Sequence, residues 1–146
     1  SWFRKSKKCI ILMSEEMYKE IILDHYKHPR NKGVFPDAEV SAEDYNPVCG
    51  DRIRIDIIIN NDKVSDVKFD GEGCAISQAS ASILTEMLID KSVDEILKLD
   101  KDDILDALGT PVLGPARIKC ALLSLKVMKL GTYSYVGKDI PPDSTN

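Results

Sequence analysis

The stretch RIRIDIII, residues 52–59, has the period of a β-strand and sets the fold around it. Every second residue is isoleucine, and the charged residues between them are Arg52, Arg54 and Asp56. This period of two predicts a strand with one apolar face and one charged face. Residues 60–62 (NND) are interpreted as a hairpin turn, and residues 63–71 as the strand that returns from it.

Residues 37–46 are interpreted as a weaker strand at the edge of the same sheet. The sequence therefore predicts a small antiparallel three-stranded sheet, with one face packed and the other in water. Because these strands precede a series of helices, the fold class is α+β, with the helices packed on one face of the sheet.

Helical patterns occupy both sides of the strand region. Ser14 is a favourable N-cap for a first helix, which is predicted to end near His28 because a proline follows. After the strands, apolar residues recur at helical spacing over residues 76–88. His25 and His28 are interpreted as surface residues of the first helix.

Three further helices are predicted from their end signals. Ser92 and Glu95 form a capping box for a short helix, and a second one begins at Asp100. Pro115 suits the first turn of a last helix, which is predicted to close at Gly131.

The ends of the chain differ in composition from its middle. Residues 1–13 are predicted to be a flexible basic arm, residues 14–131 the globular domain, and residues 132–146 a disordered tail. The basic residues of the arm are Arg4, Lys5, Lys7 and Lys8. The rest of the chain is therefore more acidic than the net charge of -4 suggests.

Composition excludes several classes of protein. A chain of 146 residues with 43% hydrophobic residues is long enough for one domain with a real core. An acidic body argues against a nucleic-acid partner, and no apolar run approaches the length of a membrane span. The apolar part of the basic opening is too short for a signal peptide. We expect a cytoplasmic protein.

Four cysteines are widely spaced along the chain, which in a reducing compartment favours metal binding or thiol chemistry over disulfides. Cys9 lies in the basic arm and is not taken as a ligand. Cys49 lies in the turn before the isoleucine-rich strand. Cys74 lies between a strand and a helix, and Cys120 in the first turns of the last helix. Element ends of this kind can converge on one rim of the sheet.

Asp51 follows Cys49 by two residues and could add one oxygen ligand to three sulfurs, a set that suits zinc or iron. Cys74 and Cys120 lie near helix N-termini, where free N–H groups favour the thiolate. The spacing matches no compact zinc-finger pattern, however, and each cysteine alone could be a buried small side chain. From the residues alone, a shared site and separate buried cysteines both stay open.

Four sequence motifs together resemble one known family. NPVCGD (residues 46–51), GEGCAISQASAS (71–82) and ARIKCALLSLK (116–126) occur in that order, and YKEIILDHYKHPRNKG (18–33) is similar to that family's first helix. They resemble the IscU/SufU/NifU N-terminal family of iron–sulfur cluster assembly scaffold proteins, over about residues 14–131.

This resemblance implies a function. A pyridoxal-phosphate cysteine desulfurase (IscS/SufS/NifS-like) would deliver sulfur, and iron would complete a [2Fe-2S] cluster on Cys49, Asp51, Cys74 and Cys120. The cluster would then pass to recipient apo iron–sulfur proteins, so the chain would be a scaffold and not a turnover enzyme. Attack on a persulfide requires an exposed thiol of low pKa, and Cys120 is our choice as first acceptor. A homo-oligomer such as a dimer is left open.

Two departures from the family pattern keep an alternative open. IscU chains usually have histidine before the third cysteine, whereas Lys119 stands here, as in SufU. SufU chains carry an insertion for which residues 91–114 look too short. Lys119 would lie near the fourth ligand position, more simply as a solvated lysine that tunes the thiolates. The alternatives are a SufU-like zinc-dependent sulfurtransferase, with zinc on Asp51 and the three cysteines, and a structural zinc domain.

Overall fold

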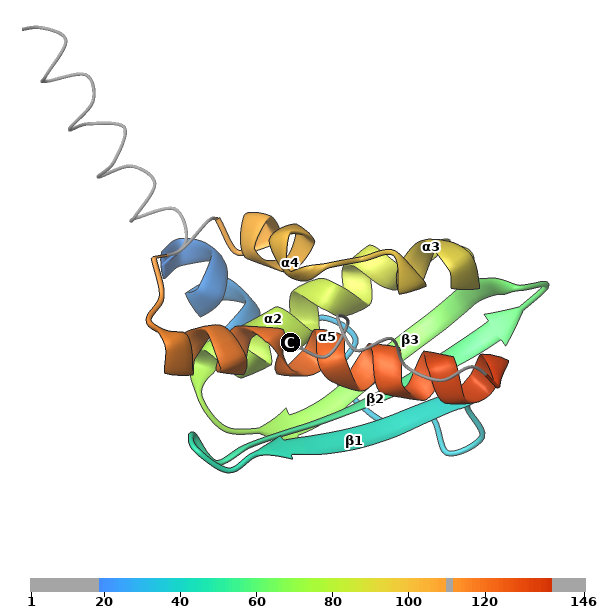
Figure 1. Ribbon diagram of the computed structural model, residues 1–146, viewed down its shortest axis with the longest axis horizontal. Coiled ribbons are helices and arrows are strands. Elements are labelled where there is room, and N and C mark those ends of the chain that lie inside the picture. The colour runs from blue at the N-terminus through green and yellow to red at the C-terminus, as the bar shows by residue number, and fades with distance from the viewer. Residues whose placement is uncertain (1–18, 110–111, 138–146) are drawn as a thin grey trace, which may run out of the picture.

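The computed structural model describes residues 19–109 and 112–137, which form an α+β fold around a three-stranded sheet (Figure 1). Residues 19–27 are helical, and three strands and then four further helices follow along the described part of the chain. They are β1 (Val40–Asn46), β2 (Asp51–Asn60), β3 (Lys63–Glu72), α2 (Ala75–Leu88), α3 (Val93–Leu97), α4 (Lys101–Ala107) and α5 (Pro115–Val136).

The sheet is antiparallel with the order β1-β2-β3, which confirms the predicted strands. Asn60 pairs with Lys63, and the two residues between them have positive φ angles, as a tight hairpin turn requires. At the other end of β2, Asn46 pairs with Asp51 across the turn that contains Cys49. The sheet therefore delivers Asp51 and the end of β3 to the same rim.

The apolar face of β2 is the centre of the core. Ile53, Ile55 and Ile57 are fully buried there. Figure 1 shows α2 and α5 on one face of the sheet, with α3 and α4 beyond them, which confirms the predicted arrangement. None of the helices in the described part of the chain has the length and hydropathy needed to cross a bilayer.

The opposite face of the sheet is less open than predicted. Asp56, expected in water, is 1% exposed and accepts hydrogen bonds from Ser41 Oγ (2.6 Å) and the Phe35 backbone N–H (3.0 Å). The segment before β1 causes this burial, since it also pairs with the outer side of β3. There the N–H of Gly33 donates to Phe69 O at 2.8 Å, and the N–H of Phe69 donates to Asn31 O at 3.0 Å.

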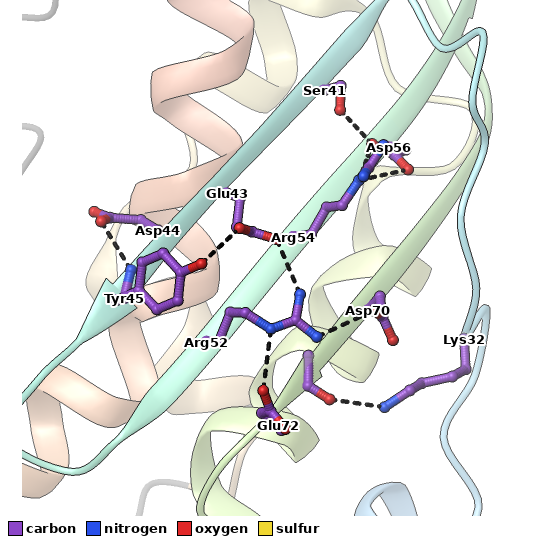
Figure 2. Close-up of polar contacts among 11 residues, drawn as sticks. Lys32, Ser41, Glu43, Asp44, Tyr45, Arg52, Arg54, Asp56, Asp70 and Glu72 are labelled. Carbon is purple, nitrogen blue, oxygen red and sulfur yellow. Dashed lines mark hydrogen bonds and ion pairs between the residues drawn. The ribbon is translucent and has the colours of Figure 1, made fainter.

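Nearer the site, the outer face carries a network of ion pairs (Figure 2). Arg52 lies between three carboxylates, those of Glu43 in β1 and of Asp70 and Glu72 in β3. These contacts tie the ends of all three strands together, one residue away from Asp51 and two residues before Cys74.

Capping explains most of the helix boundaries. The capping box of Ser92 with Glu95 is confirmed, and Asp100 forms a second one with Asp103. The first helix ends before His28, as predicted, whereas its predicted start at Ser14 lies outside the described residues.

The predicted end of the last helix at Gly131 is wrong, because α5 continues to Val136 and ends at Gly137, which has a φ of 73°. Gly131 is buried against β1, where a Cβ atom would lie 2.8 Å from Val40 Cγ1. The glycine therefore serves close packing of the helix on the strand. Residues 132–136 of the predicted tail are helical, and residues 138–146 lie outside the described part.

Candidate metal centre

Three of the predicted site residues converge at the rim of the sheet. One ligand atom each from Cys49, Asp51 and Cys120 can be chosen so that all three lie within 4.8 Å of one another. Cys49 comes from the β1–β2 turn, Asp51 is the first residue of β2, and Cys120 lies in the second turn of α5. Segments 71 residues apart in sequence thus meet at one point.

Cys74 adjoins this group through Asp51. It is the N-cap residue of α2, and its backbone N–H donates to Asp51 Oδ1 at 2.8 Å while its thiol lies 3.7 Å from Asp51 Oδ2. Gly73 makes this approach possible, since a Cβ atom there would collide with the Asp51 carboxylate. All four predicted ligands therefore lie at one rim, with Asp51 linking Cys74 to the other two.

The thiol of Cys120 is enclosed. It donates to Cys49 Sγ at 2.8 Å and lies 3.6 Å from Asn46 Nδ2, a donor that is itself buried. Burial raises the pKa of Cys120, and the neighbouring Cys49, Asp51 and Cys74 raise it further. The expectation that the Cys120 thiol is exposed is therefore wrong, while its role as first sulfur acceptor stays a prediction. The residue lies beyond the first turn of α5, where the N–H groups already have helical partners.

Cys49 and Cys74 are both half-buried, so each is more accessible than Cys120. The Sγ atom of Cys74 accepts the backbone N–H of Ser77 at 3.5 Å, as an N-cap side chain does. Cys49 lies in a four-residue turn, and its Sγ is 2.8 Å from that of Cys120.

The chemistry of this donor set fits a metal ion. Three thiols and a carboxylate meet here, and Asp51 forms no ion pair with any Lys, Arg or His of the described residues. A buried carboxylate without a countercharge is costly, and one cation would offset that cost. Sulfur donors with one oxygen suit zinc or iron, whose ligands at about 2.3 Å would lie roughly 3.8 Å apart.

Lys119 lies outside this group. Its side chain is exposed on α5 and makes no hydrogen bond or ion pair with another described residue. This position agrees with the simpler interpretation of Lys119, that of a solvated side chain next to the site. His25 is less exposed than expected, because its ring packs on α2 with Nδ1 2.8 Å from Ser82 Oγ.

Two supporting residues were not predicted. Asn46 donates to the Cys120 thiol, and Ser77 supplies an N–H to Cys74. Both residues lie inside the cysteine motifs, so their closeness in sequence to Cys49 and Cys74 is the feature that could have identified them as supporting residues. Asn46 is 8% exposed, and a buried amide at the start of a turn indicates a specific partner.

Comparisons with known proteins identify the family of the chain. Residues 17–141 match the family described as the NifU-like N terminal domain. The zinc-dependent sulfurtransferase SufU of Bacillus subtilis is 43% identical over 133 residues, which cover 80% of this chain and 90% of that protein. The iron–sulfur cluster assembly scaffold protein IscU of Aquifex aeolicus is 38% identical over 123 residues, covering 83% of this chain and 77% of the other.

A solved structure gives the same result. The putative iron–sulfur cluster assembly scaffold protein for the SUF system from Fervidobacterium islandicum superposes with a TM-score of 0.67 at 30% identity. The match covers 81% of this chain and 98% of the other. With its sheet, its three cysteine motifs and the matched range in agreement, the chain belongs to the NifU-like N-terminal domain family.

Proposed function

We propose that this protein is a scaffold on which an iron–sulfur cluster is assembled from sulfur supplied by a cysteine desulfurase and then passed to apo-proteins. The convergence of Cys49, Asp51 and Cys120 at one rim, where none of the described Lys, Arg or His residues pairs with Asp51, carries the proposal. Cys74 adjoins them through Asp51. We propose a [2Fe-2S] cluster as the cargo, with these four residues as its ligands.

Asp51 would make a cluster bound at this site easier to release. Thiolates bind iron more firmly than a single carboxylate oxygen does, so one oxygen among three sulfurs is the weakest point of the set. Asp51 is also held by the Cys74 N–H, which competes for its lone pairs. Asp51→Ala is therefore expected to slow cluster loss or transfer to an apo-protein. The decay of cluster absorbance measures this rate. An unchanged transfer rate would contradict this role.

For the entry of sulfur, the geometry favours a different thiol from the one chosen from sequence. Cys120 is buried, whereas Cys49 lies half-buried in a turn. We propose that the Cys49 thiolate attacks the outer sulfur of the donor's persulfide. The donor's S–S bond breaks, the donor leaves as a thiolate, and Cys49 becomes the persulfide. Cys120, 2.8 Å away, is the second thiol within reach.

A zinc-dependent sulfurtransferase is the second candidate, because the relative with 43% identity carries that name. Zinc held by Asp51 and the cysteines would keep the thiols deprotonated for the same attack. The alignment lengths do not separate the two candidates. The 133 aligned positions of SufU take in 80% of this chain, and the 128 aligned positions of a relative named IscU take in 77%, so both relatives have residues without a counterpart here.

One measurement separates the two candidates: iron, acid-labile sulfide and zinc per chain, in protein purified without oxygen. Comparable amounts of iron and sulfide with little zinc would support the scaffold. About one zinc per chain without sulfide, together with sulfur acceptance from the desulfurase, would support the sulfurtransferase. Serine variants of Cys49, Cys74 and Cys120, taken one at a time, should each lower the bound metal. Unchanged metal content in all three would overturn the site.

A further inference from the structure

A groove of about 680 Å³ lies beside the cysteine site. One wall is the end of β1 with the β1–β2 turn, and the other is the N-terminal half of α5. Figure 1 places this turn and the start of α5 at the same end of the molecule. Nothing in the proposed assembly of a cluster uses this groove, so its role is open.

The groove is continuous with the site through both walls. Val48, next to Cys49, lines it, and so does Lys119, next to Cys120. Asn46 lines it as well and donates to the Cys120 thiol. A chain lying in the groove would therefore end beside the Cys49–Cys120 pair.

The groove offers apolar surface where a folded chain normally hides it. Val48 is 73% exposed and Tyr45 is 58% exposed, although both are large enough to favour burial. Ile118 and Leu122 add an apolar strip from α5. Exposed apolar side chains gathered at one concave place are typical of a surface that a partner covers.

The charge of the groove is opposite to that of the whole chain. Its described lining residues include Lys119 and Lys126 and no acidic residue, whereas the chain has a net charge of -4. Lys126 pairs with Asp44 at 2.9 Å, while Lys119 has no ion-pair partner among the described residues. The first turn of α5, which has no side-chain cap, adds positive potential at Pro115. These features suit a segment that carries carboxylates beside apolar side chains.

We propose that this groove binds an extended, apolar and acidic segment of the sulfur-donating protein and guides its persulfide to Cys49. The inference rests on the proposed function. A sulfur atom must come to about 3–3.5 Å from the attacking thiolate before the exchange described above can occur. Docking one residue away from Cys49 supplies that approach, whereas the Cys120 thiol is fully buried and lies against Asn46 Nδ2.

The test uses the full chain with a purified pyridoxal-phosphate cysteine desulfurase and ³⁵S-labelled L-cysteine. Two variants change the groove without replacing a proposed ligand. Lys126→Glu replaces one of its two lysines by an acid, so that the charges of its lining side chains cancel, and Val48→Ser removes an exposed apolar side chain. Lys98→Glu, an exposed lysine on the C-cap of α3, is the matched control. Metal content and the unfolding midpoint of each variant establish that the site and the fold are intact.

Both groove variants are expected to weaken desulfurase binding and low-concentration sulfur transfer by about five- to tenfold. The saturated transfer rate should stay within about twofold, because Cys49 is unchanged. Reconstitution with iron and inorganic sulfide, which needs no donor protein, should also be unchanged. The Lys126→Glu defect should shrink at high salt in comparison with the defect of Val48→Ser.

Donor affinity within twofold of the parent in both variants would overturn the proposal. A defect confined to cluster transfer to an apo-protein would also overturn it, because the groove would then bind the recipient. A defect confined to self-association would overturn it as well, because the groove would then bind a second copy of the chain. Failure of the proposed function has a separate signature, since the unmodified chain would then accept no ³⁵S at any concentration of desulfurase.

Discussion

Two aspartates of β2, Asp51 and Asp56, are equally buried at 1% exposure, yet only one of them has a cation beside it. Asp56 receives hydrogen bonds from the Phe35 N–H and from Ser41. It also pairs with Arg54, whose Nε lies 3.1 Å from Asp56 Oδ1 (Figure 2). Asp51 receives one backbone N–H and is otherwise next to thiols. The difference indicates that Asp56 serves folding, and it supports the proposal that Asp51 is a metal ligand.

The largest expected effect tests the structural half of this comparison. Asp56→Asn should lower the free energy of unfolding by about 3 kcal/mol, because it leaves Arg54 without its countercharge and weakens the bonds to Ser41 and Phe35. Urea unfolding measures this loss. Zinc binding by the folded fraction should be unchanged. A loss of unfolding free energy below about 1 kcal/mol would contradict the structural role of Asp56.

Metal removal tests the other half. Zinc at about 100 times its dissociation constant should stabilise the chain by roughly 2.7 kcal/mol, and a chelator should remove this gain. Unfolding curves with and without the chelator give the difference. The same gain should persist in Asp56→Asn and shrink in Asp51→Asn. An equal gain in all three proteins would mean that zinc binds away from Asp51.

A pair of glycine substitutions sharpens the comparison at the Asp51 end. Gly73→Ala should weaken zinc binding by about tenfold or more, because the new methyl group collides with the Asp51 carboxylate. Gly50→Ala is the matched control, since Gly50 also has a positive φ, of 70°, but has open space around it. Isothermal titration should separate the two variants. Equal losses would point to backbone strain as the cause in both.

The smallest expected effect is also the most direct contrast. In the metal-free protein, Asp51→Asn should leave the free energy of unfolding within about 1 kcal/mol of the parent value, or raise it, because it removes an uncompensated buried charge. The same substitution at Asp56 is expected to cost several times more. If both variants lose the same stability, Asp51 has a structural partner and the contrast fails.

Local patterns explain why much of this molecule could be predicted from sequence. Alternating isoleucines specify β2, and the capping boxes at Ser92 and Asp100 depend on residues three apart. The three cysteine motifs indicated a shared site only through their resemblance to a known family, because the residues alone left separate buried cysteines open.

Features that depend on distant packing could not be predicted in this way. Asp56 looked exposed because the segment that covers it is irregular and has no periodic pattern. Gly131 looked like a helix end, whereas contact with β1 makes it an internal packing residue. The burial of Cys120 likewise depends on the β1–β2 turn, which is distant in sequence.

The pairing of residues 31–33 with β3 also affects how the chain behaves when crowded. An unpaired strand edge is a template on which another chain can add a strand, and such addition leads to aggregation. Here the Phe69 N–H and C=O are already bonded to the segment around Lys32, so the middle of the β3 edge is closed. Under the proposed function the protein repeatedly contacts other chains to exchange sulfur, and this pairing leaves one fewer edge through which those contacts could become permanent.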